Sequence, residues 1–243
     1  MQKVTLLTHT ENPEQIIAAA AKLCYSSKTD IESLLNDLTP EKVEAFVSKL
    51  ESLGHESPFE HVSFTFGVEG VSRALLAQAT RSRIGVSFSV RSQRYVGESK
   101  FGYVVPPKVQ ANDERMRAYE EAMEQARQSY NHLIELGVPK EDARMVLPNA
   151  CKTRMVVTMN VRALWHFALL RCCNRAQWEI RSMAREMLKL AKEAAPVLFK
   201  HAGAACEVHG YCPEGKMCCG KAPTLDKIIK VYEEHNGETR EKV

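Results

Sequence analysis

The sequence predicts an α+β fold. Helical apolar periodicity recurs in many segments, strand-like patterns are few, and the strands do not alternate regularly with the helices. Strands are predicted at 62–68, where valines and phenylalanines alternate with other residues, and at 155–161, where β-branched residues gather. Helices are predicted at 13–24, 39–53, 72–81, 112–136, 162–173, 176–197 and 224–235, with another beginning near 140.

The predicted helices begin and end at residues that favour such positions. Asn12 precedes Pro13 as an N-cap, and the second helix starts at Thr39-Pro40. Gly54 ends the second helix, and a glycine and a proline follow the long helix. Residues 81–99 fit no clean period. Residues 96–111 are rich in glycine and proline and are predicted as a loop with at most one short strand.

Composition excludes several classes of protein. The 243 residues are 44% hydrophobic and 26% charged, which is typical of globular proteins and not of disordered ones. No apolar run is long enough for a membrane helix, and the first residues lack the apolar core of a secretory signal, so we expect a cytoplasmic protein. The net charge of +3 is too small to imply a nucleic-acid partner by itself.

Four titratable side chains lie close together in the sequence GHESPFEH at 54–61, where a helix leads into a strand. His55, Glu56, Glu60 and His61 are residue types that serve in acid–base catalysis and metal binding. Their order matches no zinc motif. A solvated loop with histidines bonded to the backbone is therefore the simpler interpretation.

A basic stretch at 78–95 predicts an anion site. It contains four arginines and four serines: Arg81, Arg83, Arg91, Arg94, Ser82, Ser87, Ser89 and Ser92. Guanidinium groups bind phosphate through paired donors, and hydroxyls add further donors. Gln78 and Arg81 share one face if the preceding helix continues. A nucleic-acid contact strip and solvated surface charge are the alternatives.

A third group of arginines lies in largely apolar segments between 144 and 181. Arg162 and His166 are spaced i, i+4 on one predicted helix, and Arg171 lies near its end. A buried charge is unfavourable without a partner. Glu179 and a bound anionic ligand are both candidate partners, and the spacing favours neither.

The tail holds four of the eight cysteines. Cys206, His209, Cys212 and Cys218 or Cys219 could bind zinc, but their spacing is not that of paired CxxC motifs, and free thiols are the simpler interpretation in a reducing compartment. We therefore predict no metal. Dinucleotide, P-loop and hydrolase-serine motifs are absent from the sequence, so a nucleotide or flavin would be held by side chains on another fold.

Taken in order, these segments resemble the flavin-dependent thymidylate synthases over roughly residues 15–200. GHESPFEHVSFTF resembles the segment before the family signature, which is Arg-His-Arg, seven residues, then Ser, closing on Arg-Tyr. Arg81-Ser82-Arg83 and Ser92-Gln93-Arg94-Tyr95 stand in its place. ARMVLPNACKTR, MNVRALWHF and LLR…RAQWEIR resemble three later blocks.

The signature departs from the family pattern at two points. Ser82 replaces its histidine, and eight residues rather than seven separate Arg83 from Ser92. We expect the extra residue to form a bulge or wider turn within 84–91. It leaves Val90 or Arg91 where the family usually has Glu or Gln.

The resemblance implies an enzyme that methylates dUMP to dTMP. Methylenetetrahydrofolate would give the carbon, and NADPH would reduce a bound FAD that supplies the hydride. The resemblance also implies helices packed on a small, mostly antiparallel sheet in a single domain over 1–200, with a Cys-rich extension and a short helix at 201–243. The partners are then small-molecule substrates and other copies in a homotetramer with shared active sites, with no nucleic acid and no membrane.

The same resemblance assigns site residues. The dUMP-binding positions are Gln78, Arg81, Ser92, Arg94, Arg144 and Arg171. The FAD-binding positions are Ser57, Arg81, Ser82, Arg83, Asn160, Arg162 and His166. Arg171 has the catalytic role, because a guanidinium beside the pyrimidine imide would stabilise the negative charge that develops there. No cysteine is expected to act as a nucleophile.

Two other functions are compatible with these residues. One is a relative that binds flavin and a nucleotide but methylates weakly or acts on another pyrimidine. The other is a nucleic-acid-binding module with a zinc-bearing tail, which predicts salt-dependent binding of polynucleotides. The aromatic content of 7% and the lack of a recognised nucleic-acid motif argue against the module.

Overall fold

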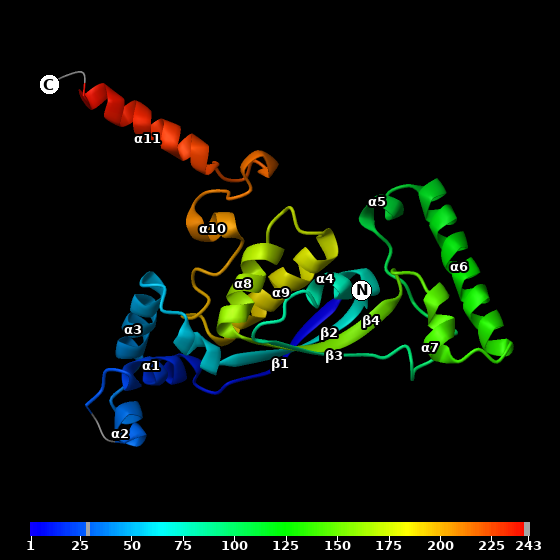
Figure 1. Ribbon diagram of the computed structural model, residues 1–243, viewed down its shortest axis with the longest axis horizontal. Coiled ribbons are helices and arrows are strands. Elements are labelled where there is room, and N and C mark those ends of the chain that lie inside the picture. Colours follow the sequence, from blue (N-terminus) through cyan, green and yellow to red (C-terminus); the bar gives the residue numbers. More distant parts are fainter. Residues whose placement is uncertain (28–29, 241–243) are drawn as a thin grey trace. The chain divides into compact units, whose positions relative to one another are not determined.

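The protein combines helices with one four-stranded antiparallel sheet, as the computed structural model shows for residues 1–27 and 30–240 (Figure 1). The strands are β1 (Lys3–His9), β2 (Ser63–Ser72), β3 (Val86–Val90) and β4 (Lys152–Asn160), in the order β1-β2-β4-β3. The predicted α+β class is therefore confirmed.

Helices make up most of the remaining structure. The α-helices are α1 (Pro13–Leu23), α2 (Ile31–Asn36), α3 (Pro40–Ser52), α4 (Arg73–Ala79), α5 (Pro107–Gln110), α6 (Asp113–Glu135), α7 (Lys140–Ala143), α8 (Val161–Arg171), α9 (Trp178–Ala194), α10 (Ala205–His209) and α11 (Leu225–Arg240). Short 3-10 helices lie at η1 (Ser57–His61), η2 (Arg144–Val146) and η3 (Gly215–Met217). Among the described residues, no helix combines the length and apolar character needed to cross a bilayer.

Strand β2 shows why these residues form a sheet. Phe64, Phe66 and Val68 are fully buried and alternate with more exposed positions, which is the two-residue period of a strand. Strand β4 repeats this pattern, with alternate residues buried along its length. The hydroxyl of Thr65 on β2 lies 2.9 Å from that of Thr158 on β4, so the two neighbouring strands also share a side-chain hydrogen bond.

Several predicted boundaries agree with the structure, and several elements were not predicted. Residues 81–99 show no clean period in the sequence, yet they contain β3, which is preceded by Gly85 in the left-handed region at φ 68°. Strand β1 and helices α2 and α10 were also not predicted, and α5 lies within residues 96–111, which were predicted as a loop. Asn12 precedes α1 as predicted, but its side chain makes no capping hydrogen bond.

The chain divides into two compact units, each built from separate segments. The first comprises residues 1–5, 65–83 and 87–158, and includes α4, α5, α6 and α7. Its core includes Phe101, Met123 and Cys151, with partly buried tyrosines packed against them.

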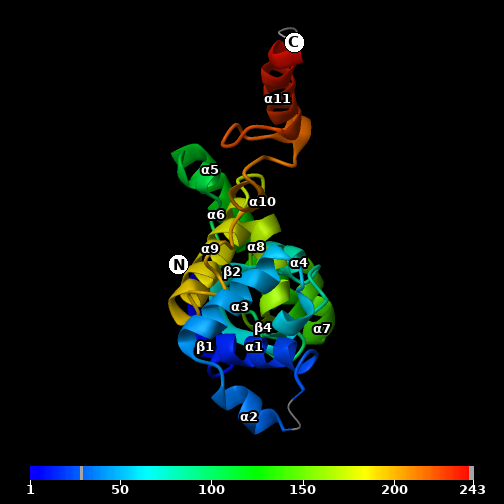
Figure 2. The same cartoon turned by 90° about the vertical axis from the view of Figure 1, so that its left-hand side faces the viewer.

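The second unit comprises residues 6–64, 84–86 and 159 onward. Within it α1 packs against α3, and α8 packs against α9 (Figure 2). Phe59, Phe64 and Phe199 are completely buried there, and the Phe64 and Phe199 rings meet edge to face with centroids 5.2 Å apart.

Candidate active site

The first unit carries seven of the predicted site residues, beginning with Gln78 on α4. Helix α4 ends at Ala79, so the helical face that Gln78 and Arg81 would share does not extend to Arg81. The N–H of Ser82 donates to the Ala79 carbonyl at 3.1 Å and closes the turn that follows.

Arg81 and Arg83 leave this turn with exposed side chains. Within the described part of the chain, neither guanidinium makes a hydrogen bond or an ion pair. Two unpaired cations two residues apart form a surface that is chemically suited to an anion such as a phosphate.

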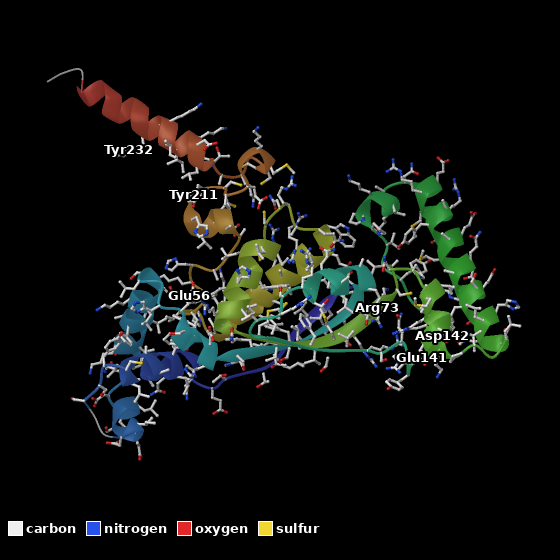
Figure 3. The ribbon with its side chains drawn as sticks, in the orientation of Figure 1. Glu56, Arg73, Glu141, Asp142, Tyr211 and Tyr232 are labelled. Atoms are coloured by element: carbon white, nitrogen blue, oxygen red, sulfur yellow. The ribbon has the colours of Figure 1, made fainter. Side chains whose placement is uncertain are left out.

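Glu141, which lies on α7 (Figure 3), contacts both Arg94 and Arg144. The Arg94 Nε donates to the Glu141 carboxylate at 2.9 Å, and the Arg144 Nε donates to the Glu141 backbone carbonyl at 3.0 Å. The hydroxyl of Ser92 accepts from the Arg94 N–H at 3.2 Å. Three predicted dUMP-binding residues thus belong to one connected group, whereas nothing in the sequence analysis indicated Glu141.

The second unit carries Ser57, Asn160, Arg162, His166 and Arg171. Asn160 is the N-cap of α8, and its Oδ1 accepts from the Ala163 N–H at 2.8 Å. This bond orients the amide and leaves Nδ2 as the donor end. Arg162 and His166 follow on α8 with exposed side chains, at the predicted i, i+4 spacing.

Arg162 is held by two carboxylates of the GHESPFEH segment. Its Nε lies 2.9 Å from Glu56 and its Nη1 lies 2.5 Å from Glu60, with all three side chains about half exposed. These hydrogen bonds, that to Glu60 first, raise the pKa of Arg162 above its usual range. Glu56 and Glu60 are therefore partners of an arginine, and Ser57 is an exposed residue at the start of η1 between them.

Arg171 is half-buried in the last turn of α8, where the partial negative charge of a helix C-terminus favours a cation. Cys172 follows it and is 3% exposed. Burial raises the pKa of the Cys172 thiol to about 11, so the thiolate that a nucleophile requires is scarce near neutral pH. Glu179 lies 2% exposed in the first turn of α9.

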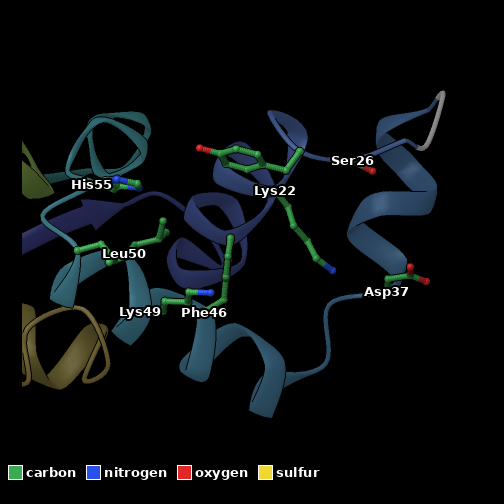
Figure 4. A pocket seen from close by; sticks show the side chains of 9 residues that line it. Lys22, Ser26, Asp37, Phe46, Lys49, Leu50 and His55 are labelled. Atoms are coloured by element: carbon green, nitrogen blue, oxygen red, sulfur yellow. The ribbon is translucent and has the colours of Figure 1, made fainter.

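A cavity of about 490 Å³ lies within the second unit among α1, α3 and neighbouring turns (Figure 4). It is lined by Lys22, Tyr25, Ser26, Asp37, Phe46, Lys49, Leu50, Leu53 and His55. His55 is the member of the GHESPFEH cluster that lies there, and the residues predicted to bind dUMP or FAD do not line it.

The cysteine-rich tail follows α9. Within the described residues, no group of three or more His, Cys, Asp or Glu side chains is arranged to hold a metal ion. The N–H of Gly220 lies 3.3 Å from the Cys218 sulfur, and this contact holds the pKa of that thiol below its usual range. Cys212 is 6% exposed and pairs through its backbone with Thr224.

Comparison with known proteins places this arrangement in a family. The model of the family described as thymidylate synthase complementing protein matches residues 5–197. The chain is 50% identical over 230 residues to the flavin-dependent thymidylate synthase of Geobacter sulfurreducens, covering 94% of this chain and 98% of that protein. It is 48% identical over 242 residues to the enzyme of that name from Clostridium tetani, covering 93% of this chain and 96% of that protein.

A solved structure shares the fold. It is the crystal structure of a UMP/dUMP methylase PolB from Streptomyces cacaoi bound with 5-Br dUMP, with a TM-score of 0.71 and 24% sequence identity. The likeness covers 82% of this chain and 93% of that one. From the family match and the two sequence relatives, the chain belongs to the family of the flavin-dependent thymidylate synthases.

Proposed function

We propose that the protein is a methyltransferase that converts dUMP to dTMP, taking the carbon from methylenetetrahydrofolate and the hydride from NADPH through a bound FAD. The observation that carries this proposal is the cationic set of the signature, of η2 and of α8 in a chain of this family: Arg81, Arg83, Arg94, Arg144, Arg162 and Arg171. A dianionic nucleotide and a cofactor with a diphosphate both require such donors.

The residues proposed for FAD fit a phosphate-bearing cofactor. Arg81 and Arg83 offer guanidinium groups without competing partners in the described residues, and Asn160 offers an oriented amide donor. Arg162 is presented at the surface by Glu56 and Glu60, with Ser57 adjacent in sequence. Ser82 and His166 complete the proposed set. When bound, the flavin would carry the hydride from NADPH to the transferred carbon.

The proposed role of Arg171 is to activate the pyrimidine. Carbon C5 of uracil attacks a methylene group more readily when negative charge on the imide is stabilised. A guanidinium stays protonated at any working pH, so it can do this without a proton transfer. Cys172 lies next to it, but its raised pKa opposes the covalent thiolate chemistry that would be the alternative.

The proposed phosphate end of dUMP is bound by Ser92, Arg94 and Arg144, with Gln78 and Arg81 contributing from the end of α4 and the turn after it. In the structure Arg94 forms an ion pair with Glu141, and both side chains are about half exposed. An exposed ion pair contributes little stability, so a phosphate dianion can replace the carboxylate at low free-energy cost.

We also propose the homotetramer with shared active sites and the cytoplasmic location. The division into a matched domain over 1–200 and an extension over 201–243 is likewise proposed. It is supported by the family model, which ends at residue 197.

The test begins with the purified full chain. Its visible absorbance should show oxidised flavin, and dUMP should raise its thermal midpoint, because a ligand of the native state stabilises it. Formation of dTMP should require NADPH and methylenetetrahydrofolate. UMP tested beside dUMP separates the proposed activity from that of a relative with another pyrimidine substrate. A colourless protein that binds polynucleotides in a salt-dependent manner would refute the proposal.

A further inference from the structure

A buried ion pair closes the loop that carries Ser92 and Arg94. The Arg91 Nη1 lies 3.1 Å from the Glu98 Oε1 and 3.2 Å from its Oε2, and the Glu98 side chain is only 2% exposed. The contact to Oε2 is a hydrogen bond. Oε1 makes no hydrogen bond, and the nearby positive charge of the guanidinium offsets the free-energy cost of burying this oxygen. The pair joins the two ends of segment 91–98.

Both partners are fixed to the first unit by further bonds. The Arg91 N–H donates to the Arg154 carbonyl on β4 at 3.1 Å, and the Arg91 carbonyl accepts from the Arg73 Nη2 at 2.7 Å. The Glu98 N–H donates to the hydroxyl of Tyr130 on α6 at 3.2 Å, and Tyr130 is 1% exposed. The loop is thereby tied to β4 at one end and to α6 at the other.

Between these ends, the loop folds on itself. The Arg94 N–H donates to the Ser92 hydroxyl at 3.2 Å, and the Val96 N–H donates to the Ser92 carbonyl at 3.1 Å. Ser92 and Arg94 therefore occupy a tight turn whose ends are fixed. A site that is held in its binding geometry before the ligand arrives loses less conformational entropy on binding.

Arg91 is unlike the other arginines of the signature. Its guanidinium is directed inward to Glu98, and its Nη2 lies 3.5 Å from the Gly97 carbonyl, whereas Arg81 and Arg83 are exposed. A buried pair is weak evidence for stability, since apolar residues often replace one without loss. The Arg91–Glu98 pair joins the two ends of the loop, and this position indicates a role other than stabilising the fold.

We propose that the Arg91–Glu98 pair positions the loop that binds the phosphate of dUMP, so that Arg91 and Glu98 are positioning residues for substrate affinity. This inference rests on the proposed function, because it takes Ser92 and Arg94 as dUMP ligands. Breaking the pair weakens dUMP binding and raises KM. The turnover number at saturating dUMP stays nearly unchanged, because no reacting atom is touched.

The experiment uses the full-length protein with its FAD content measured. The main variant is the double substitution Arg91→Met with Glu98→Leu, which removes both charges and leaves no unpaired one. Glu98→Gln is the second variant, because it keeps the side-chain size and an acceptor oxygen while removing the negative charge. Lys100→Gln is the matched control, since it removes an exposed charge two residues beyond the loop.

We expect the double variant to bind dUMP about tenfold more weakly or worse, with kcat within about threefold of wild type and unchanged FAD content. Glu98→Gln should shift the dUMP Kd in the same direction, and Lys100→Gln should stay within about twofold. A dUMP Kd within about twofold of wild type, in either folded variant of the Arg91–Glu98 pair, would refute the positioning role of the pair and leave the proposed function standing. If the wild type binds no dUMP, the proposed function is refuted, and the positioning role of the Arg91–Glu98 pair is refuted with it.

Discussion

Asn160 lies directly against Gly85. A Cβ on Gly85 would stand 2.6 Å from the Asn160 Nδ2 and 2.7 Å from its Oδ1, which is closer than any real contact of this kind. Gly85 also has a φ of 68°, in the region that favours glycine. The turn before β3 and the N-cap of α8 are therefore fitted to each other within the second unit.

Gly85→Ala should lower FAD affinity as well as stability. The new methyl group would displace the Asn160 amide, which caps α8 and is proposed to bind the cofactor. Gly137→Ala is the control, because Gly137 also has a positive φ, of 85°, but open space around it. Both variants should lose about 1 kcal/mol or more of unfolding free energy from backbone strain. Equal FAD content in the two variants would contradict the proposed role of Asn160.

Arg171→Ala should reduce kcat on dUMP about a hundredfold or more while FAD stays bound, because one lost donor to a developing charge typically has that effect. Cys172→Ala should stay within about tenfold of wild type, with any loss coming from packing of this buried residue. Steady-state formation of dTMP measures both. Normal turnover in Arg171→Ala, or a folded but inactive Cys172→Ala enzyme, would reverse the assignment.

Ser82→His should retain FAD and can tighten its binding. Ser82 stands where the family signature has a histidine, and a flat ring offers a stacking surface for a flavin. Ser82 is half-buried in the turn after α4, so the ring must fit that turn. The ratio of FAD to protein is the measurement, with Ser82→Ala as the variant that adds no ring. A large loss of FAD in Ser82→His alone would show that residues 81–83 do not match the signature.

Glu51 makes the stability depend on pH. Burial raises its pKa from 4.5 to about 7, although Lys200 opposes the shift. The folded state therefore binds a proton that the unfolded state has lost between these two values, and stability falls as pH rises from about 4.5 to 7. Glu51→Gln should remove this dependence and stabilise the fold by about 1–2 kcal/mol at pH 8, after allowance for solvent screening.

Urea unfolding at pH 5 and pH 8 tests this, with Glu44→Gln on the same helix as the exposed control. The same pH dependence in wild type and Glu51→Gln would show that another group is responsible.

Local sequence patterns predicted most of the helices and the two central strands, because burial imposes a period on each of them. Strand β3 shows where that approach failed. Val86, Phe88 and Val90 do alternate with serines, but flanking arginines drew the interpretation toward an anion site. Helix α4 ends at Ala79 before any glycine or proline, so the residues around it gave no signal for its end.

The ion-pair partners of the charged residues could not be predicted from local sequence patterns. Glu56 and Glu60 precede Arg162 by about one hundred residues in the sequence, as the separations of 106 and 102 positions show. The sequence therefore favoured a solvated loop over metal or acid–base chemistry for this cluster and gave no sign that two of its carboxylates pair with Arg162. Glu141 was overlooked for the same reason, because only folding brings its carboxylate to Arg94.

The Arg91–Glu98 pair restricts how this chain can change over evolution. A substitution at only one of the two positions leaves the other charge without a partner, and a buried charge without a partner is strongly destabilising. Exchange at the two positions should therefore be correlated among close relatives, with both charges kept or both replaced by apolar residues. Arg91 and Glu98 would then be gained or lost together in the history of the family.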